Sequence, residues 1–198
     1  MKRKSLFLIF FFFPIFVLGQ TKTNLNIFNE LVDSSVVSLI NNLHTNGNEI
    51  NLKLELGNTY SLFQNRILYD LKEGNIKVNL FPQRNENITN INFAIEKMEV
   101  NYYDIERESL FGEFLMPREL TIKGNFSISR ENTFTKNYNY TFLDTVNVKA
   151  VSELENASYT ITKGKMPSEP FFSSITEPVI VISSAAVAVI LFFTIRSK

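Results

Sequence analysis

Residues 50–80, INLKLELGNTYSLFQNRILYDLKEGNIKVNL, decide the fold of this chain. Apolar and polar side chains alternate from Ile50 to Leu56, which predicts a half-buried strand. Apolar side chains then recur at helical spacing, at Phe63, Ile67 and Leu71. Gly74 is predicted to end this helix, and renewed alternation over 76–80 predicts a second strand. Strand, helix and strand within about thirty residues have the length of a βαβ unit, so we expect parallel strands joined by a right-handed crossover.

A further helix is predicted before this unit. Residues 27–43 carry an apolar side chain at every third or fourth position, and Asn46-Gly47 provides a stop signal. This spacing is typical of an amphipathic helix that packs one face on a sheet.

After the βαβ unit the sequence changes to long alternating segments. The first, over residues 91–102, slips by one position, which predicts a β-bulge near Glu96 and Lys97. Two more segments follow over 120–128 and 138–142. Long alternating strands without helices between them indicate an antiparallel meander.

We therefore expect one α+β domain in residues 20–167, since about 150 residues is the usual size of one domain. A helix-strand-helix-strand unit is followed by an antiparallel β meander, and two helices cover one face of a mixed sheet. A helical turn over 150–158 and a last short strand over 158–164 complete the expected domain.

The order of elements over 26–80, with a helix that closes in LYDLKEGNIKVN before a Val-containing strand, resembles two groups of small α/β envelope domains. These are the TolB N-terminal domains and the curli-secretion (CsgG or FlgO-like) domains. The resemblance implies a component that assembles into or regulates envelope machinery and has no catalytic residues. Many members of those groups are lipid-anchored through a cysteine, and this chain has no cysteine.

The N-terminus, MKRKSLFLIFFFFPIFVLGQ, has three basic residues and then an apolar run. Val17 and Gly19 occupy the small-residue positions of a cleavage site, so residues 1–19 are predicted to be a signal peptide cleaved before Gln20. The alternative is a retained transmembrane helix, but the run of about thirteen residues is shorter than the roughly twenty that a span needs. The absence of cysteine excludes lipid attachment at this site, disulfides and Cys-based zinc sites.

The C-terminal residues 178–195 carry no charge over eighteen positions. As a helix they would rise about 27 Å, enough to cross a hydrocarbon core, so they are predicted to form a transmembrane helix. Arg196 and Lys198 would mark the cytoplasmic side, with 196–198 as a short tail and the domain outside.

The predicted membrane segment contains two finer signals. Phe171 and Phe172, in a tether over 168–177, are predicted to lie at the membrane interface. Ser184 and Ala188 form a small-xxx-small pair that would let another helix approach closely.

Charge and composition restrict the function of the domain. Five of the 20 basic residues lie outside residues 20–177, which hold all 20 acidic ones, so this segment has a net charge of −5. Such a surface is a poor partner for nucleic acid. With one histidine, His44, and no cysteine, the chain cannot form a usual zinc site or a Ser-His-Asp triad, and we predict no cofactor.

Two features are candidates for binding or chemistry. The segment 110–120, LFGEFLMPREL, is expected to connect two strands. Its apolar residues are predicted to form either a short edge strand or a partner-binding lip: Phe111, Phe114, Leu115 and Met116. Asp104, Glu106 and Glu108 would project from one face of a strand end, where they suit a solvated charged edge and, as an alternative, a carboxylate hydrolase.

The leading functional hypothesis is a non-enzymatic interaction or assembly component of the cell envelope, such as a component of a secretion or surface-assembly complex. It would bind a protein partner or form a homo-oligomer. It would be anchored in the inner membrane by its C-terminal helix, with the domain in the periplasm, and the frequent Asn, Ile, Lys and Phe residues favour a bacterial source. One alternative is an envelope hydrolase that uses acidic residues. The other is a surface protein whose TEP-containing tail is an exosortase-like sorting signal.

Overall fold

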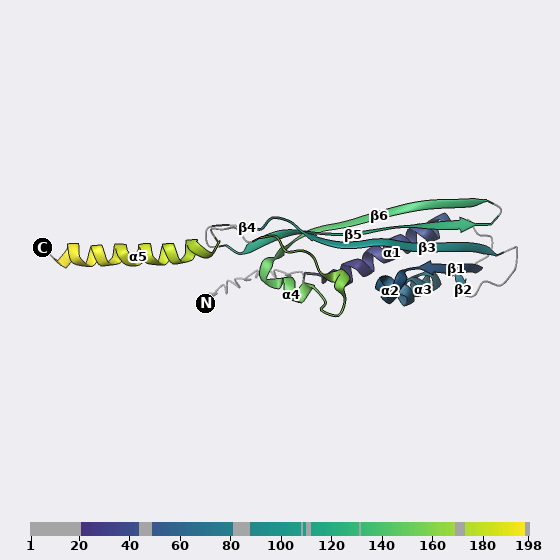
Figure 1. Ribbon diagram of the computed structural model, residues 1–198, viewed down its shortest axis with the longest axis horizontal. Coiled ribbons are helices and arrows are strands. Elements are labelled where there is room, and N and C mark those ends of the chain that lie inside the picture. The colour runs from purple at the N-terminus through teal and green to yellow at the C-terminus, as the bar shows by residue number, and fades with distance from the viewer. Residues whose placement is uncertain are drawn as a thin grey trace, which may run out of the picture.

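The computed structural model describes residues 21–43, 49–80, 88–107, 109, 112–130, 132–168 and 173–196. Within the last of these segments, side chains are described from Val179 to Ile195. The elements lie along one long axis, with α5 at one end of the molecule (Figure 1).

The helices and strands follow in the order α1 (Asn24–Asn42), β1 (Glu49–Glu55), α2 (Gly57–Tyr60), η1 (Ser61–Phe63), α3 (Gln64–Glu73), β2 (Lys77–Asn79), β3 (Thr89–Tyr102), β4 (Glu106–Arg107), β5 (Phe114–Ser129), β6 (Thr133–Asn147), η2 (Val148–Ala150), α4 (Val151–Leu154), η3 (Thr160–Thr162) and α5 (Ser173–Arg196).

The strands form one mixed sheet. Its order is β2-β1-β3-β5, with β4 and β6 each paired to β5. β1 pairs in parallel with β2 on one side and with β3 on the other, whereas β3, β4 and β6 each run antiparallel to β5. The predicted parallel βαβ unit and antiparallel meander are therefore confirmed, and the fold is α+β.

One face of the sheet is apolar and lies against α1 and α3. Thr23 caps α1 by accepting a 3.3 Å hydrogen bond from the backbone N–H of Asn26, which satisfies one of the free donors at the helix start. The inward-facing apolar side chains of α1, η1 and α3 are fully buried and belong to the core cluster: Ile27, Phe28, Val32, Val36, Leu39, Phe63, Ile67 and Leu71. Alternate residues of the strands supply the other half of this core.

The opposite sheet face is polar, because the other set of alternating residues points to it. Cross-strand partners there include the rows Asn92, Ser127 and Thr135, and Asn90, Ser129 and Thr133. Helices thus cover one face only, as expected from the amphipathic spacing of the sequence.

The predicted bulge is present where β3 meets β5. The register shifts between Ile95 and Lys97, and Ile95 lies opposite Gly124. A Cβ atom at Gly124 would lie 2.1 Å from the carbonyl oxygen of Ala94, so only glycine fits there. The bulge keeps apolar residues on the core side along the whole of β3.

Two expectations for the later part of the chain need correction. Residues 114–120 are part of β5 and do not form a connection, because β4 and β6 pair with them on either side. The predicted last strand over 158–164 is instead the single 3₁₀ turn η3, followed by an isolated bridge between Lys165 and Asn101. The helical turn expected within 150–158 is present as α4, which ends at Leu154.

The C-terminal apolar segment is helical, as predicted. In the part of the chain that the structure describes, however, no helix has the length and apolarity needed to cross a membrane. The predicted transmembrane span over 178–195 is therefore not supported.

Candidate interaction surfaces

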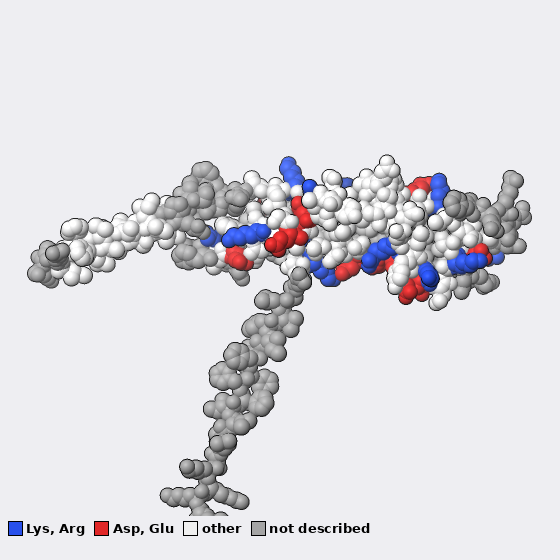
Figure 2. All heavy atoms as spheres, turned by 90° about the horizontal axis from the view of Figure 1, so that it is seen from below, with Lys and Arg blue, Asp and Glu red and all other residues white. Residues whose placement is uncertain are grey.

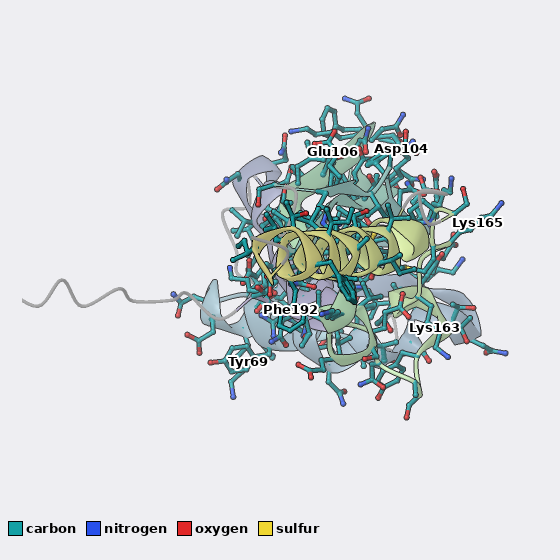
Figure 3. The ribbon with its side chains drawn as sticks, turned by 90° about the vertical axis from the view of Figure 1, so that its left-hand side faces the viewer. Tyr69, Asp104, Glu106, Lys163, Lys165 and Phe192 are labelled. Atoms are coloured by element: carbon teal, nitrogen blue, oxygen red, sulfur yellow. The ribbon has the colours of Figure 1, made fainter. Side chains whose placement is uncertain are left out.

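The surface of α5 is apolar around its whole circumference. Its large side chains are 51–74% exposed: Val179, Val181, Ile182, Val187, Val189, Ile190, Leu191, Phe192, Phe193 and Ile195. The described part of this helix shows no charged side chain, whereas acidic and basic residues are interspersed along the domain (Figure 2). Phe192 projects from the helix in the end-on view of Figure 3.

The hydroxyl groups of α5 do not create a polar face. Ser183 donates to the carbonyl oxygen of Val179 at 2.6 Å, and Ser184 donates to that of Val181 at 2.9 Å. Thr194 donates to the carbonyl oxygen of Ile190 at 2.8 Å. Because each hydroxyl bonds to the backbone of its own helix, little polar surface is left.

The predicted helix-packing and interface residues are placed as follows. Ser184 and Ala188 are both exposed on α5, and their contact with another helix stays a prediction. Arg196 is the last residue of α5. The other residues assigned to the interface or to the lip lie outside the described residues: Phe111, Phe171, Phe172 and Lys198.

The predicted lip is a paired piece of sheet. Phe114 and Leu115 are half-buried and lie opposite Arg107 and Glu106 of β4. The guanidinium of Arg107 lies 4.8 Å from the centre of the Phe114 ring, a cation–π contact. Met116 is fully buried in the core, so the prediction that it contacts a partner is wrong.

The acidic row does not form an enclosed site. Asp104 and Glu106 are exposed and lie at the periphery of the domain in Figure 3. A shallow cavity of about 230 Å³ lies beside Glu106, lined by Glu106, Arg107, Leu115, Pro117 and Thr145. The described residues contain no group of three or more His, Cys, Asp or Glu side chains that could hold a metal ion. His44 and Glu108 lie outside the described residues.

The polar sheet face is hollowed near the ends of β1 and β3. A cavity of about 400 Å³ is lined there by Asn51, Leu52, Lys53, Leu80, Asn90, Ile91, Asn92, Ser127 and Ser129. Asn51 donates to Asn90 at 2.9 Å, but the Oδ1 atoms of Asn51 and Asn92 are buried without a partner among the described residues. The sequence analysis did not predict this cavity. The signal for it is the Asn and Ser residues at the polar positions of adjacent strands.

A charge cluster joins α1 to α3. Arg66 donates to both carboxylate oxygens of Asp33, each at 2.5 Å. Burial acts to raise the pKa of Asp33, but the hydrogen bonds from Arg66 and Asp70 outweigh it and hold the pKa below its usual value. Burial and the neighbouring Asp33 raise the pKa of Asp70 to about 6. The two carboxyls therefore differ in charge over the acidic pH range.

A second cluster is centred on Arg118, whose side chain is fully buried. It donates to both carboxylate oxygens of Asp144 at 2.9 and 2.6 Å, to Asn24 Oδ1 at 2.6 Å and to the carbonyl oxygen of Lys22 at 3.1 Å. Asn24 in turn donates to the hydroxyl of Tyr102 and to the carbonyl oxygen of Thr162. One guanidinium thus ties the start of α1 to two strands, and the role of this cluster is structural.

No protein-family model matches the chain, and no curated protein sequence matches it. Two crystal structures are similar to it at 12% identity. One is a minor lipoprotein from Acinetobacter baumannii, with a TM-score of 0.35, over 52% of this chain and 77% of that one. The other is the rare lipoprotein B from Shewanella oneidensis, with a TM-score of 0.33, over 71% of this chain and 98% of that one. Similarity at this level assigns neither a family nor a role to the chain.

Proposed function

We propose that the chain is a membrane-attached protein of the cell envelope that acts as a non-enzymatic interaction or assembly component. In this proposal α5 attaches the folded domain to the lipid bilayer, and the sheet domain binds protein partners outside the membrane. The signal peptide predicted in residues 1–19 supports export of the domain.

The observation that carries the attachment is the all-round apolar surface of α5. A helix that is apolar on every side is stable only when it is buried in protein or lipid. Each large side chain contributes on the order of 1–2 kcal/mol when it leaves water. The described domain covers almost none of this helix, so lipid is the environment that we assign to it.

The interaction role is supported by the surfaces that the domain leaves open. Its polar sheet face has no covering element among the described residues, and β6 is a long outer strand of the sheet. Sheet edges bind extended segments of partner proteins through main-chain hydrogen bonds.

Membrane fractionation of the full chain tests the attachment. The double variant Val187→Lys/Ile190→Lys places two charges on one side of α5, where each costs roughly 3 kcal/mol inside a bilayer. We expect it to move into the soluble fraction, whereas the native chain remains in the membrane pellet after a carbonate wash.

Gln64→Lys/Asn65→Lys is the matched control, because both residues are exposed on α3, away from β6, and the charge change is the same. The control variant should stay in the pellet. Equal release of the native chain and of both variants would contradict the attachment. An intact mass lacking the last twenty or so residues would instead favour the sorting tail.

A further inference from the structure

The outer edge of β6 is open along an unusual length. The strand has fifteen residues and pairs with β5 from end to end, and no described strand pairs with its other side. Such an edge presents a row of N–H and C=O groups that can add another strand. Lys136 and Asp144 are the only charged side chains of β6, so the edge carries little of the charge that usually prevents pairing.

The sequence of β6 is arranged symmetrically about Tyr140, the middle residue of the strand. Lys136 lies four residues before Tyr140 and Asp144 lies four residues after it. When two copies of the strand run antiparallel with Tyr140 opposite Tyr140, Lys136 of each copy faces Asp144 of the other. From this symmetry we propose that β6 is a dimerisation edge, at which two copies of the chain join their sheets about a two-fold axis at Tyr140.

The other pairs in this register are also favourable. Tyr138 lies opposite Phe142, and Phe134 lies opposite Val146. On the polar face, Thr135 lies opposite Thr145. Aromatic, aromatic–β-branched, Thr–Thr and opposite-charge pairs are the combinations that stabilise adjacent strands.

Neighbouring registers lose this complementarity. If the centre moved to residue 139 or 141, Lys136 would face Phe142 or Val146 in place of Asp144. A pairing centred between two residues would set the core face of one sheet beside the polar face of the other. The sequence therefore specifies one register.

The charged groups that would meet, and the Phe134 ring, are accessible. Asp144 already binds Arg118, but its side chain is 26% exposed and a carboxylate has about four acceptor positions, so it can accept a lysine as well. Lys136 is exposed, and Phe134 is 49% exposed. Pairing would cover the Phe134 ring and satisfy the outer backbone groups of β6.

The inference rests on the proposed interaction role, for which it names a second copy as the partner. It involves a different surface from the attachment through α5. A chain that stays in the membrane fraction but is monomeric would contradict the dimer alone.

The first test measures the mass of the full chain in a mild detergent by light scattering. We expect a dimer for the native chain. Lys136→Glu sets like charges against each other twice across the two-fold axis, and it should weaken the dimer by at least about tenfold. Lys163→Glu makes the same charge change at an exposed residue away from β6 and should leave the dimer intact.

Thermal unfolding of both variants confirms that they are folded. A monomeric native chain, or a Lys136→Glu dimer as tight as the native one, would overturn the proposal. A native chain that is monomeric alone and binds a different protein along β6 would overturn the assignment of a second copy.

The second test determines the register by disulfide cross-linking. The chain has no cysteine, so only the introduced cysteines can form a disulfide. Asn137 and Leu143 are exposed and lie opposite each other across the proposed axis, within the Cα distance that a disulfide spans. We expect a mixture of the Asn137→Cys and Leu143→Cys chains to form a disulfide-linked dimer under mild oxidation. Either variant alone should not, since six residues of strand, about 20 Å, separate the equivalent cysteines. Equal linking in the single variants, or none in the mixture, would contradict this register.

Discussion

Asp70 lies beside the ion pair of Asp33 and Arg66, and its negative charge is less stable than that of Asp33. Its Oδ2 atom is buried and has no hydrogen-bond partner among the described residues, and its pKa is raised to about 6. The unfolded chain releases this proton near pH 4. The contribution of the Asp70 carboxyl to the free energy of unfolding is therefore fully present below about pH 4 and is lost as the pH rises through about 6.

Replacing Asp70 with Asn removes a charge that the fold disfavours at neutral pH. We expect Asp70→Asn to raise the thermal unfolding midpoint at pH 7.5 and to leave it nearly unchanged at pH 4. The gain in the free energy of unfolding at pH 7.5 should be below about 1 kcal/mol, because Asp70 is only half-buried and water screens its charge. The exposed Asp104→Asn serves as the control, and an equal shift in both variants would contradict this explanation.

Among the substitutions considered, replacing Arg118 should lower the free energy of unfolding most. Its four hydrogen bonds satisfy groups on α1, on β6 and at Lys22, and removing it leaves Asp144 without its buried partner. Truncating one member of such a pair typically costs about 3–5 kcal/mol. We expect this loss for Arg118→Ala in denaturant unfolding, and less than about 0.5 kcal/mol for the exposed Lys123→Ala on the same strand. Similar losses in both variants would contradict the role of the cluster.

At the level of elements, the β-bulge depends on the close contact at Gly124. Besides the carbonyl oxygen of Ala94, an added Cβ would lie 2.4 Å from the hydroxyl of Tyr138, which donates to that carbonyl at 2.7 Å. Gly124→Ala must separate β3 from β5 or displace Tyr138. We expect a loss of about 2 kcal/mol or more in denaturant unfolding, against less than about 0.5 kcal/mol for Ser127→Ala. A Gly124→Ala chain as stable as the native one would show that the contact can relax.

The elements with a clear hydrophobic period could be predicted from the sequence. Residues 27–43 gave α1, and the alternation over 50–56 gave β1, because burial of one face fixes each period. The slip in the alternation also located the bulge, since a one-residue shift moves every later side chain to the other face. Local pattern was sufficient in these segments.

The segment 110–120 and the chain after 147 could not be predicted in this way. Met116 is apolar because the core extends to the start of β5, whereas an apolar connection has the same local sequence. The turn at Thr160–Thr162 depends on distant contacts: Asn24 binds the carbonyl oxygen of Thr162, and the Thr162 hydroxyl bonds to Asn156. The open edge of β6 likewise follows from the order of strands in the sheet. The alternation of residues within a single strand does not specify this order.

At the level of the whole molecule, α5 and the β6 edge limit how a dimer can meet a membrane. In Figure 1, α5 lies beyond one end of the sheet and runs roughly along the strands. Two copies paired antiparallel would therefore carry their α5 helices at opposite ends. The eight residues from Lys165 to Ser173 span at most about 28 Å, so two helices in one bilayer require the joined sheet to lie along the membrane surface.

The route by which α5 joins the domain also has a mechanical consequence. Lys165 bridges Asn101 of β3 in parallel, and Gly164 sits close to the Tyr102 ring, where a Cβ would come within 2.6 Å. β3 is an inner strand, paired with β1 and with β5. A force applied through α5 would therefore reach the sheet at this single bridge before it loaded the ladder between β3 and β5. That bridge and the contact of Gly164 with the Tyr102 ring would therefore give way first, so the C-terminal segment can be pulled off the sheet while β3 keeps its pairing with β5.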